Sequence, residues 1–98
     1  MIKKINHIGI AVSNLTRAII TYEALGLRVS HTEEVADMNV RVSFLPIGES
    51  SIELLEPLSS DSVIAKFIEK QGEGIHHICI EVQDIEESLK KFKKQNLQ

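Results

Sequence analysis

The chain has 98 residues, of which 43% are hydrophobic and 26% are charged, and its formal net charge is −3. This length predicts a single domain, and this composition is typical of a globular protein. The acidic net charge argues against a nucleic-acid partner, because a nucleic-acid-binding protein needs a basic face. No apolar run approaches the roughly 20 residues of a membrane span. We therefore expect neither nucleic acid nor membrane as partner.

A strand followed by a helix opens the chain. Ile8 and Ile10 recur at every second position of residues 5–12, which is the period of a strand with two distinct faces. Ser13 or Asn14 can cap the helix that follows, because both side chains accept hydrogen bonds from free backbone N–H groups. The apolar residues of this helix are Leu15, Ala18, Ile19, Tyr22 and Leu25, and Gly26 supplies its C-terminal stop.

Three further strands complete this first unit, so its expected order is β-α-β-β-β. The strands are predicted over residues 27–34, 40–46 and 51–56, with a turn at 36–39 and a tight connection at 48–50. Pro57 closes the last strand. Ser62 then caps a short helix whose apolar face consists of Val63, Ile64, Phe67 and Ile68.

The beginning of the chain returns at an offset of seventy residues (77 − 7 = 70), so that His7 matches His77. Residues 6–12, NHIGIAV, reappear as residues 76–82, HHICIEV. Asp84 can cap a second helix that buries Ile85, Leu89 and Phe92, and Asn96 then takes the place of Gly26. Such a long-period repeat indicates that one supersecondary unit is used more than once, with a histidine at the start of each equivalent strand.

Strand alternation places three candidate metal ligands on one face. The isoleucines of the first strand should pack beneath the helix, so His7 faces the other way, and the same alternation applies to His77. Glu53 joins this face because its neighbours Ile52 and Leu54 form the helix-facing set. Two imidazoles and a carboxylate can bind a divalent transition metal, although a single histidine in a strand is more often structural or exposed.

Three other side chains are expected to lie apart from this set. His76 should point to the opposite face from His77 and serve in packing or behind the ligands. His31 belongs to a polar strand end and should be exposed. Cys79 is expected to be an inert core residue, and as a lone cysteine it favours a cytoplasmic protein without disulfides.

The chain resembles the vicinal oxygen chelate superfamily, which includes glyoxalase I, ring-cleaving dioxygenases and antibiotic-resistance proteins. Its opening strand over residues 6–12, with the following helix and Gly26-Leu27, is similar to the start of that superfamily. The segments IELLEPLSSDS (residues 52–62), AKF (65–67) and GEGIHHI (72–78) are similar to methylmalonyl-CoA epimerases. The resemblance covers essentially all 98 residues.

The resemblance implies an α+β fold of paired βαβββ modules whose sheets curl around one divalent metal ion. Module one would cover about residues 1–57, a connecting helix 62–71, and the start of an incomplete module two 75–98. The ligands would be His7, Glu53 and His77, with a fourth, a glutamate, expected at position 123 (53 + 70), beyond Gln98. Cobalt, nickel, zinc and manganese all accept such nitrogen and oxygen ligands.

The activity that the resemblance implies is epimerisation of methylmalonyl-CoA by proton transfer through a metal-stabilised enolate. Such a reaction needs two acid–base groups. One would be the glutamate beyond Gln98, and the other corresponds to Val42, which carries no acid, so the catalytic residues stay unknown. Glu33 and Glu34 lie nearby but are expected to be solvated, and Lys66 is a candidate for binding a CoA phosphate.

Two alternatives remain open. The first is lactoylglutathione lyase (glyoxalase I) activity on a glutathione hemithioacetal, which would use the same metal chemistry. The second is a metal- or ligand-binding protein without turnover. Exposed sheet edges favour a homodimer in each case.

Overall fold

The structure is a computed structural model that describes residues 1–83. Its elements in chain order are β1 (Ile2–Ala11), α1 (Leu15–Ala24), β2 (His31–Val35), the short 3-10 helix η1 (Ala36–Met38), β3 (Val40–Ile47), β4 (Ser50–Pro57), α2 (Val63–Gln71) and β5 (Gly74–Val82). This order confirms the predicted α+β fold and its β-α-β-β-β unit. The helix expected after Asp84 and the position of Asn96 lie outside the described residues.

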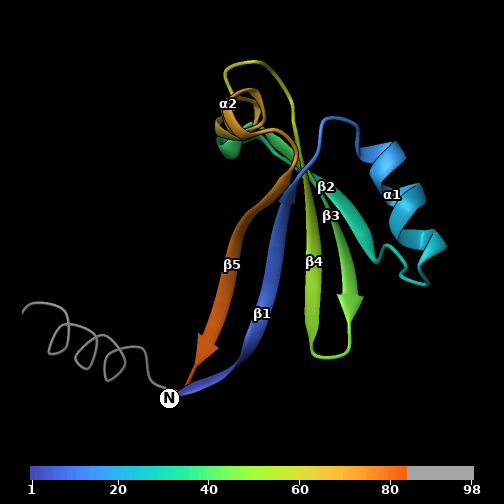
Figure 1. Cartoon of the computed structure of the whole chain (residues 1–98), viewed down its shortest axis with the longest axis vertical. Coiled ribbons are helices and arrows are strands. Elements are labelled where there is room, and N and C mark those ends of the chain that lie inside the picture. Colours follow the sequence, from blue (N-terminus) through green and yellow to red (C-terminus); the bar gives the residue numbers. More distant parts are fainter. Residues whose placement is uncertain (84–98) are drawn as a thin grey trace, which may run out of the picture.

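The five strands form one sheet with the order β2-β3-β4-β1-β5 (Figure 1). β1 pairs in parallel with β4 and antiparallel with β5, while β2, β3 and β4 follow one another as antiparallel neighbours. The two repeat-related strands, β1 and β5, are therefore adjacent. This pairing brings residues that are seventy positions apart in the sequence side by side in space.

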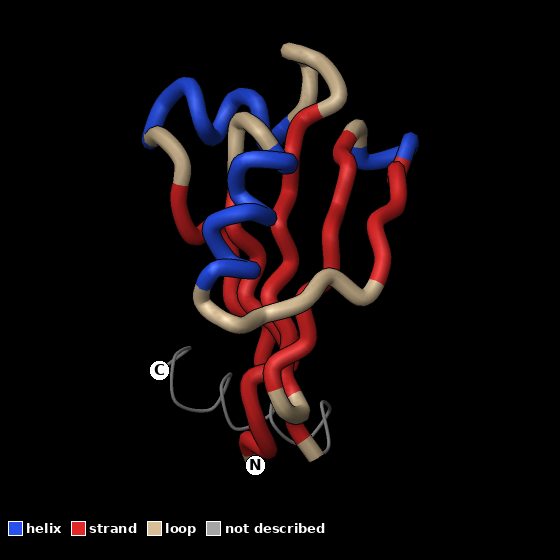
Figure 2. Tube along the Cα trace, turned by 90° about the vertical axis from the view of Figure 1, so that its right-hand side faces the viewer, coloured by secondary structure: helices blue, strands red, loops and turns tan. Residues whose placement is uncertain are grey.

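Apolar side chains pack on both faces of the sheet. α1 covers one face (Figure 2), where it packs over a cluster that includes the fully buried Leu45 and Leu54. α2 contributes Ile64, with Phe67 and Ile68 packed alongside, to a second cluster around Ala11, Val40, Val42 and Leu55. α2 lies near one end of the strands (Figure 1).

The local capping signals are confirmed where they can be checked. Asn14, rather than Ser13, caps α1, since its Oδ1 accepts a hydrogen bond of 3.0 Å from the backbone N–H of Arg17. Gly26 follows α1 with a φ of +102°, a left-handed conformation that glycine adopts without a steric cost. Ser62 caps α2 through a 3.1 Å bond from the backbone N–H of Ile64.

Several sequence-based expectations are wrong in detail. The strand expected over residues 27–34 begins only at His31, because Leu27 and Val29 reach the cluster beneath α1 from a loop. Leu25 and Val63, both expected on buried helix faces, are 75% and 67% exposed. They occupy the two helix ends, where the chain turns away from the sheet.

β5 differs most from expectation. Cys79 is exposed and is not a core residue. Ile75, Ile78 and Ile80 are also exposed, at 59%, 52% and 49%. These residues are exposed because β5 is an edge strand of the sheet formed by residues 1–83.

No helix within residues 1–83 is long and apolar enough to cross a membrane.

Candidate metal centre

Strand pairing delivers the three candidate ligands from three different strands. Gly9 of β1 is the register partner of Glu53 on β4 and of His77 on β5. Residues paired in register project from the same face of a sheet, so Glu53 and His77 flank the β1 backbone on one side. His7 precedes Gly9 by two residues and therefore shares this face.

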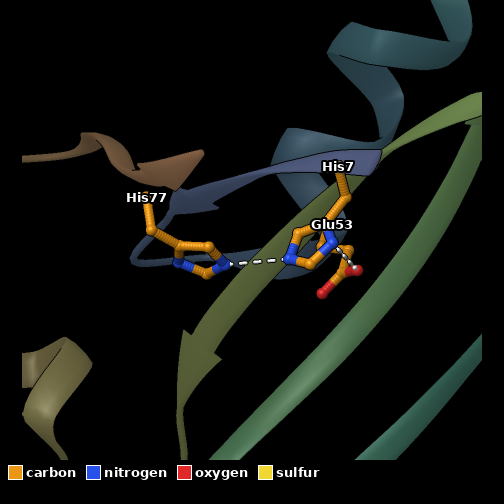
Figure 3. A group of neighbouring side chains, drawn as sticks. All are labelled: His7, Glu53 and His77. Atoms are coloured by element: carbon orange, nitrogen blue, oxygen red, sulfur yellow. Dashed lines mark hydrogen bonds and ion pairs between the residues drawn. The ribbon is translucent and has the colours of Figure 1, made fainter. Parts of the chain in front are cut away.

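The three side chains converge, as Figure 3 shows. Nε2 of His7 lies 3.1 Å from Nε2 of His77, and Nδ1 of His7 lies 3.3 Å from Oε2 of Glu53. One candidate ligand atom from each residue lies within 4.8 Å of the other two. The side chains of His7 and Glu53 are each 18% exposed, so the group is partly shielded yet open to solvent.

Gly9 makes room for this convergence. A Cβ atom at this position would lie 2.2 Å from Cε1 of His77 and 2.6 Å from both of its ring nitrogens. Since non-bonded carbon atoms do not approach so closely, the His77 ring reaches across β1 only because residue 9 has no side chain. A glycine inside a strand pattern is the sequence signal for such a close approach.

Burial sets the charge state of His77. Partial removal from solvent lowers the pKa of His77, and positive charge on His7 or His76 would lower this pKa further, against the opposing effect of Glu53. The imidazole of His77 is therefore neutral near neutral pH. A neutral imidazole is the form that can bind a metal ion.

The donor set fits a divalent transition metal. Two nitrogens bound to one ion at about 2.0–2.1 Å lie roughly 2.8–3.4 Å apart for bond angles between about 90° and 109°. The 3.1 Å between the two Nε2 atoms falls in this range. Glu53 adds an anionic oxygen, which balances part of a dication's charge.

His76 departs from its predicted orientation. Between the pairs Gly9–His77 and Ile10–Ile75 the register shifts by one residue, so His76 is an extra residue in β5. This β-bulge re-aims its side chain. Nδ1 of His76 lies 2.9 Å from Nδ1 of His77, and its ring packs edge-on against Phe67 of α2. The expectation that His76 faces away from His77 is therefore wrong.

The remaining candidates lie outside the cluster. His31 is 58% exposed, as expected, and stacks on Phe44 with 4.3 Å between ring centroids. Lys66 is exposed on α2. Glu34 forms an ion pair with Arg41 at 2.7 Å, and Glu33 pairs with His31 at 3.6 Å.

The position at which the resemblance implied a second acid–base group is apolar. Val42 is 5% exposed and belongs to the cluster beneath α2, together with Leu55 and Ile64. The side chain of Val42 can neither donate nor accept a proton. Glu33 is the register partner of Val42 on β2, but its side chain is 53% exposed.

The sheet and the two helices can be compared with those of known protein families. The family model of the glyoxalase/bleomycin resistance protein/dioxygenase superfamily matches residues 6–98. The chain therefore belongs to this superfamily, which confirms the family expected from the sequence.

Within the superfamily the chain is similar to methylmalonyl-CoA epimerases. It is 40% identical over 96 residues to the human mitochondrial enzyme of that name, matching 96% of this chain and 54% of the relative. It is 45% identical over 87 residues to an ethylmalonyl-CoA/methylmalonyl-CoA epimerase of Cereibacter sphaeroides, matching 87% of this chain and 65% of the relative. The chain thus spans about half to two thirds of these proteins.

The fold is likewise similar to that of a solved epimerase structure. A variant of the Streptomyces coelicolor methylmalonyl-CoA epimerase, in complex with 2-nitronate-propionyl-CoA, superposes with a TM-score of 0.82 at 34% identity. The match covers 97% of this chain and 71% of that one.

Proposed function

We propose that the protein is a metal-dependent isomerase that epimerises methylmalonyl-CoA. The observation that carries the proposal is the convergence of His7, Glu53 and His77 on one face of the sheet. The similarity to proteins named methylmalonyl-CoA epimerase supports the choice of substrate. The solved relative with a bound acyl-CoA analogue supports the same class of ligand.

In this proposal the described residues hold the ion and thereby place the substrate. His7 and His77 each offer an imidazole nitrogen, and Glu53 offers a carboxylate oxygen. A bound divalent cation supplies Lewis-acid stabilisation of the negative charge that develops on the substrate's oxygens when its α-proton leaves. Glu53 serves as a ligand in this scheme, so its carboxylate binds the ion and does not act as a free base.

Inversion at the α-carbon also requires a proton acceptor on one side and a proton donor on the other. Val42 is buried and apolar, so β3 supplies neither group at that position. The carboxylates of Glu33 and Glu34 form ion pairs with His31 and Arg41, respectively. The proposal therefore assigns metal binding to residues 1–83 and leaves proton transfer to other groups.

The test combines metal analysis with turnover. Elemental analysis of the protein from its native source should find about one cobalt, nickel, zinc or manganese ion per chain. Exchange of the α-proton of methylmalonyl-CoA in D2O, followed by NMR, should report epimerisation. The variant Glu53→Ala should lose metal and activity together, and Glu49→Ala is the matched control, because Glu49 is 89% exposed on a hairpin.

Three other results would contradict the proposal. Turnover of the methylglyoxal–glutathione hemithioacetal without exchange of methylmalonyl-CoA would identify a lactoylglutathione lyase. One bound metal ion with neither activity would indicate a binding protein. A metal-free protein that still epimerises the substrate would show that the His–Glu–His group is not the catalytic centre.

A further inference from the structure

The residue before each candidate histidine ligand occupies a β-bulge. On β1 the register passes from the pair Ile5–Ile80 to the pair His7–Cys79, so Asn6 is an extra residue. On β5 the extra residue is His76. Asn6 and His76 are repeat equivalents (76 − 6 = 70). Bulges re-aim side chains next to functional sites, and here both re-aimed side chains contact the histidine that follows them.

On β1 the hydrogen bonds determine which nitrogen of His7 carries the proton. Nδ2 of Asn6 donates to Oε1 of Glu81 at 3.4 Å, and Lys3 lies 3.4 Å from the other carboxylate oxygen of Glu81. This contact turns Oδ1 of Asn6 toward His7, where it lies 2.9 Å from Nδ1. A carbonyl oxygen only accepts, so Nδ1 of His7 must donate. The second neighbour of Nδ1, the Glu53 carboxylate, is also an acceptor.

On β5 the equivalent contact joins two imidazoles. Nδ1 of His76 lies 2.9 Å from Nδ1 of His77. The His76 ring is held from its far side by Phe67, at 5.0 Å between ring centroids with an interplanar angle of 79°. Nδ1 of His76 can accept the proton of His77 in the same way that the amide oxygen of Asn6 accepts that of His7.

We propose that Asn6 and His76 are positioning residues, each of which binds the Nδ1 proton of the following histidine and so leaves Nε2 of both rings as the ligating atom. The inference rests on the proposed metal centre and deepens it. Its geometric support is the 3.1 Å between the two Nε2 atoms. Two unprotonated nitrogens at this distance repel each other unless a cation lies between them, so the arrangement favours a metal ion.

Nitrogen-15 NMR of the histidine side chains tests the inference directly. In the Zn²⁺-loaded protein, which is diamagnetic, both His7 and His77 should show a protonated Nδ1 and a metal-bound Nε2. In the metal-free protein above about pH 8, where imidazoles are neutral, His7 should already be protonated at Nδ1. Coordination through Nδ1 of either ring would overturn the inference and leave the metal centre intact.

Paired substitutions separate positioning from packing. Asn6→Ala and His76→Phe remove the acceptor, and we expect each to lower Zn²⁺ affinity about 10–100-fold, as for other lost partners of metal-bound histidines. Asn6→Asp keeps an acceptor oxygen, and His76→Asn introduces the residue of the equivalent position, so both should retain the affinity and the Nδ1 proton. His76→Phe keeps the ring against Phe67, which controls for packing.

The outcomes distinguish this inference from the proposed function. Unchanged Zn²⁺ affinity and unchanged Nδ1 protonation in both Asn6→Ala and His76→Phe would overturn the positioning role only. Absence of Zn²⁺ binding by the unaltered protein would instead contradict the metal centre. Even then, the proton on Nδ1 of His7 in the metal-free protein would still report whether Asn6 acts as inferred.

Discussion

β1 and β5 are built from the same sequence pattern but lie in different surroundings. Ala11, the last residue of β1, and Val12 directly after it are 0% and 6% exposed, and Ile10 packs against the cluster beneath α1. In β5, Ile78 and Ile80 are 52% and 49% exposed. β1 has a strand on each side, whereas β5 has one neighbour within the described sheet.

The comparison separates what a repeat determines from what it leaves open. The repeat includes each histidine and the residue directly before it, which lies in a bulge on both strands. It does not fix burial, which depends on what packs against the strand. The two equivalent histidines should therefore behave alike in the proposed metal centre, whereas equivalent apolar residues of β1 and β5 should differ in their contribution to stability.

The largest effect should follow from removing either histidine. His7→Ala and His77→Ala each delete one nitrogen ligand, so we expect each to weaken Zn²⁺ binding by more than the 10–100-fold typical of an outer partner. Isothermal titration with Zn²⁺ measures the loss. His31→Ala is the control, because His31 is exposed and lies outside the cluster. A large loss in one variant and none in the other would break the equivalence of the strands.

The next effect concerns Gly9 and its repeat equivalent Cys79 (79 − 9 = 70). Gly9→Ala would place a Cβ atom 2.2 Å from Cε1 of His77, so the ring must move away from His7. We expect a loss of Zn²⁺ affinity of about 10–100-fold with the fold retained, since the φ of Gly9 is not among the positive values. Cys79→Ala should leave the affinity unchanged. Circular dichroism and Zn²⁺ titration of both variants check this.

Equal affinity of Gly9→Ala and the unaltered protein would contradict the close approach of the His77 ring to β1. An equal loss in Cys79→Ala would show that the two positions are alike after all. We expect the two substitutions to differ in their effect on Zn²⁺ affinity, because the ring of His77 crosses over Gly9 while Cys79 is exposed.

The sequence predicted the parts of the molecule that depend on local pattern. Strand alternation placed His7, Glu53 and His77 on one face, and the seventy-residue repeat predicted that the two histidines are equivalent. It could not predict the orientation of His76, because alternation holds only where the ladder is regular. A one-residue shift in strand pairing is a tertiary feature, and here it reverses the expected direction of the side chain.

Burial was predicted less well for a similar reason. Cys79 is flanked by isoleucines, which indicates a core strand, yet β5 lies at an edge and Cys79 is exposed. The role of Gly9 was also missed, although a glycine inside an alternating strand is the signal of a close approach. The sequence could not predict that the ring of His77 lies over Gly9, because this contact depends on the pairing of β1 with β5.

The third prediction addresses stability at equivalent positions. Ile10 packs against the cluster beneath α1, whereas its equivalent Ile80 is 49% exposed. Ile10→Ala should lower the free energy of unfolding by about 2 kcal/mol, at the low end for isoleucine because the side chain is only partly buried. Ile80→Ala should change it by less than about 0.5 kcal/mol. Urea denaturation measures both values.

A loss of about 2 kcal/mol in Ile80→Ala would show that β5 is covered in solution by further protein. This result would remove the difference in burial between the strands and would leave the geometry of the proposed metal centre untouched.

The smallest effect concerns charge at the end of the repeat, where β1 has the buried Ala11 and β5 has Glu81. The hydrogen bond from Asn6 lowers the pKa of Glu81 below its ordinary value of 4.5, against the opposing effect of desolvation, and Lys3 and Lys4 lower it further. Because the folded-state pKa is the lower one, the ionised carboxylate stabilises the fold above pH 4.5, and this contribution disappears as the pH falls through the folded-state pKa.

Glu81→Gln keeps an acceptor oxygen toward Asn6 but cannot ionise. At about pH 6 its Tm should lie slightly below that of the unaltered protein, and this gap should narrow as the pH falls below 4.5. The loss of stability in Glu81→Gln should be smaller than that in Ile10→Ala, because solvent screens the charge of the carboxylate. A gap of constant size across this range would mean that Asn6 is held by a neutral hydrogen bond. In that case, the orientation of the Asn6 amide would not depend on the charge of Glu81.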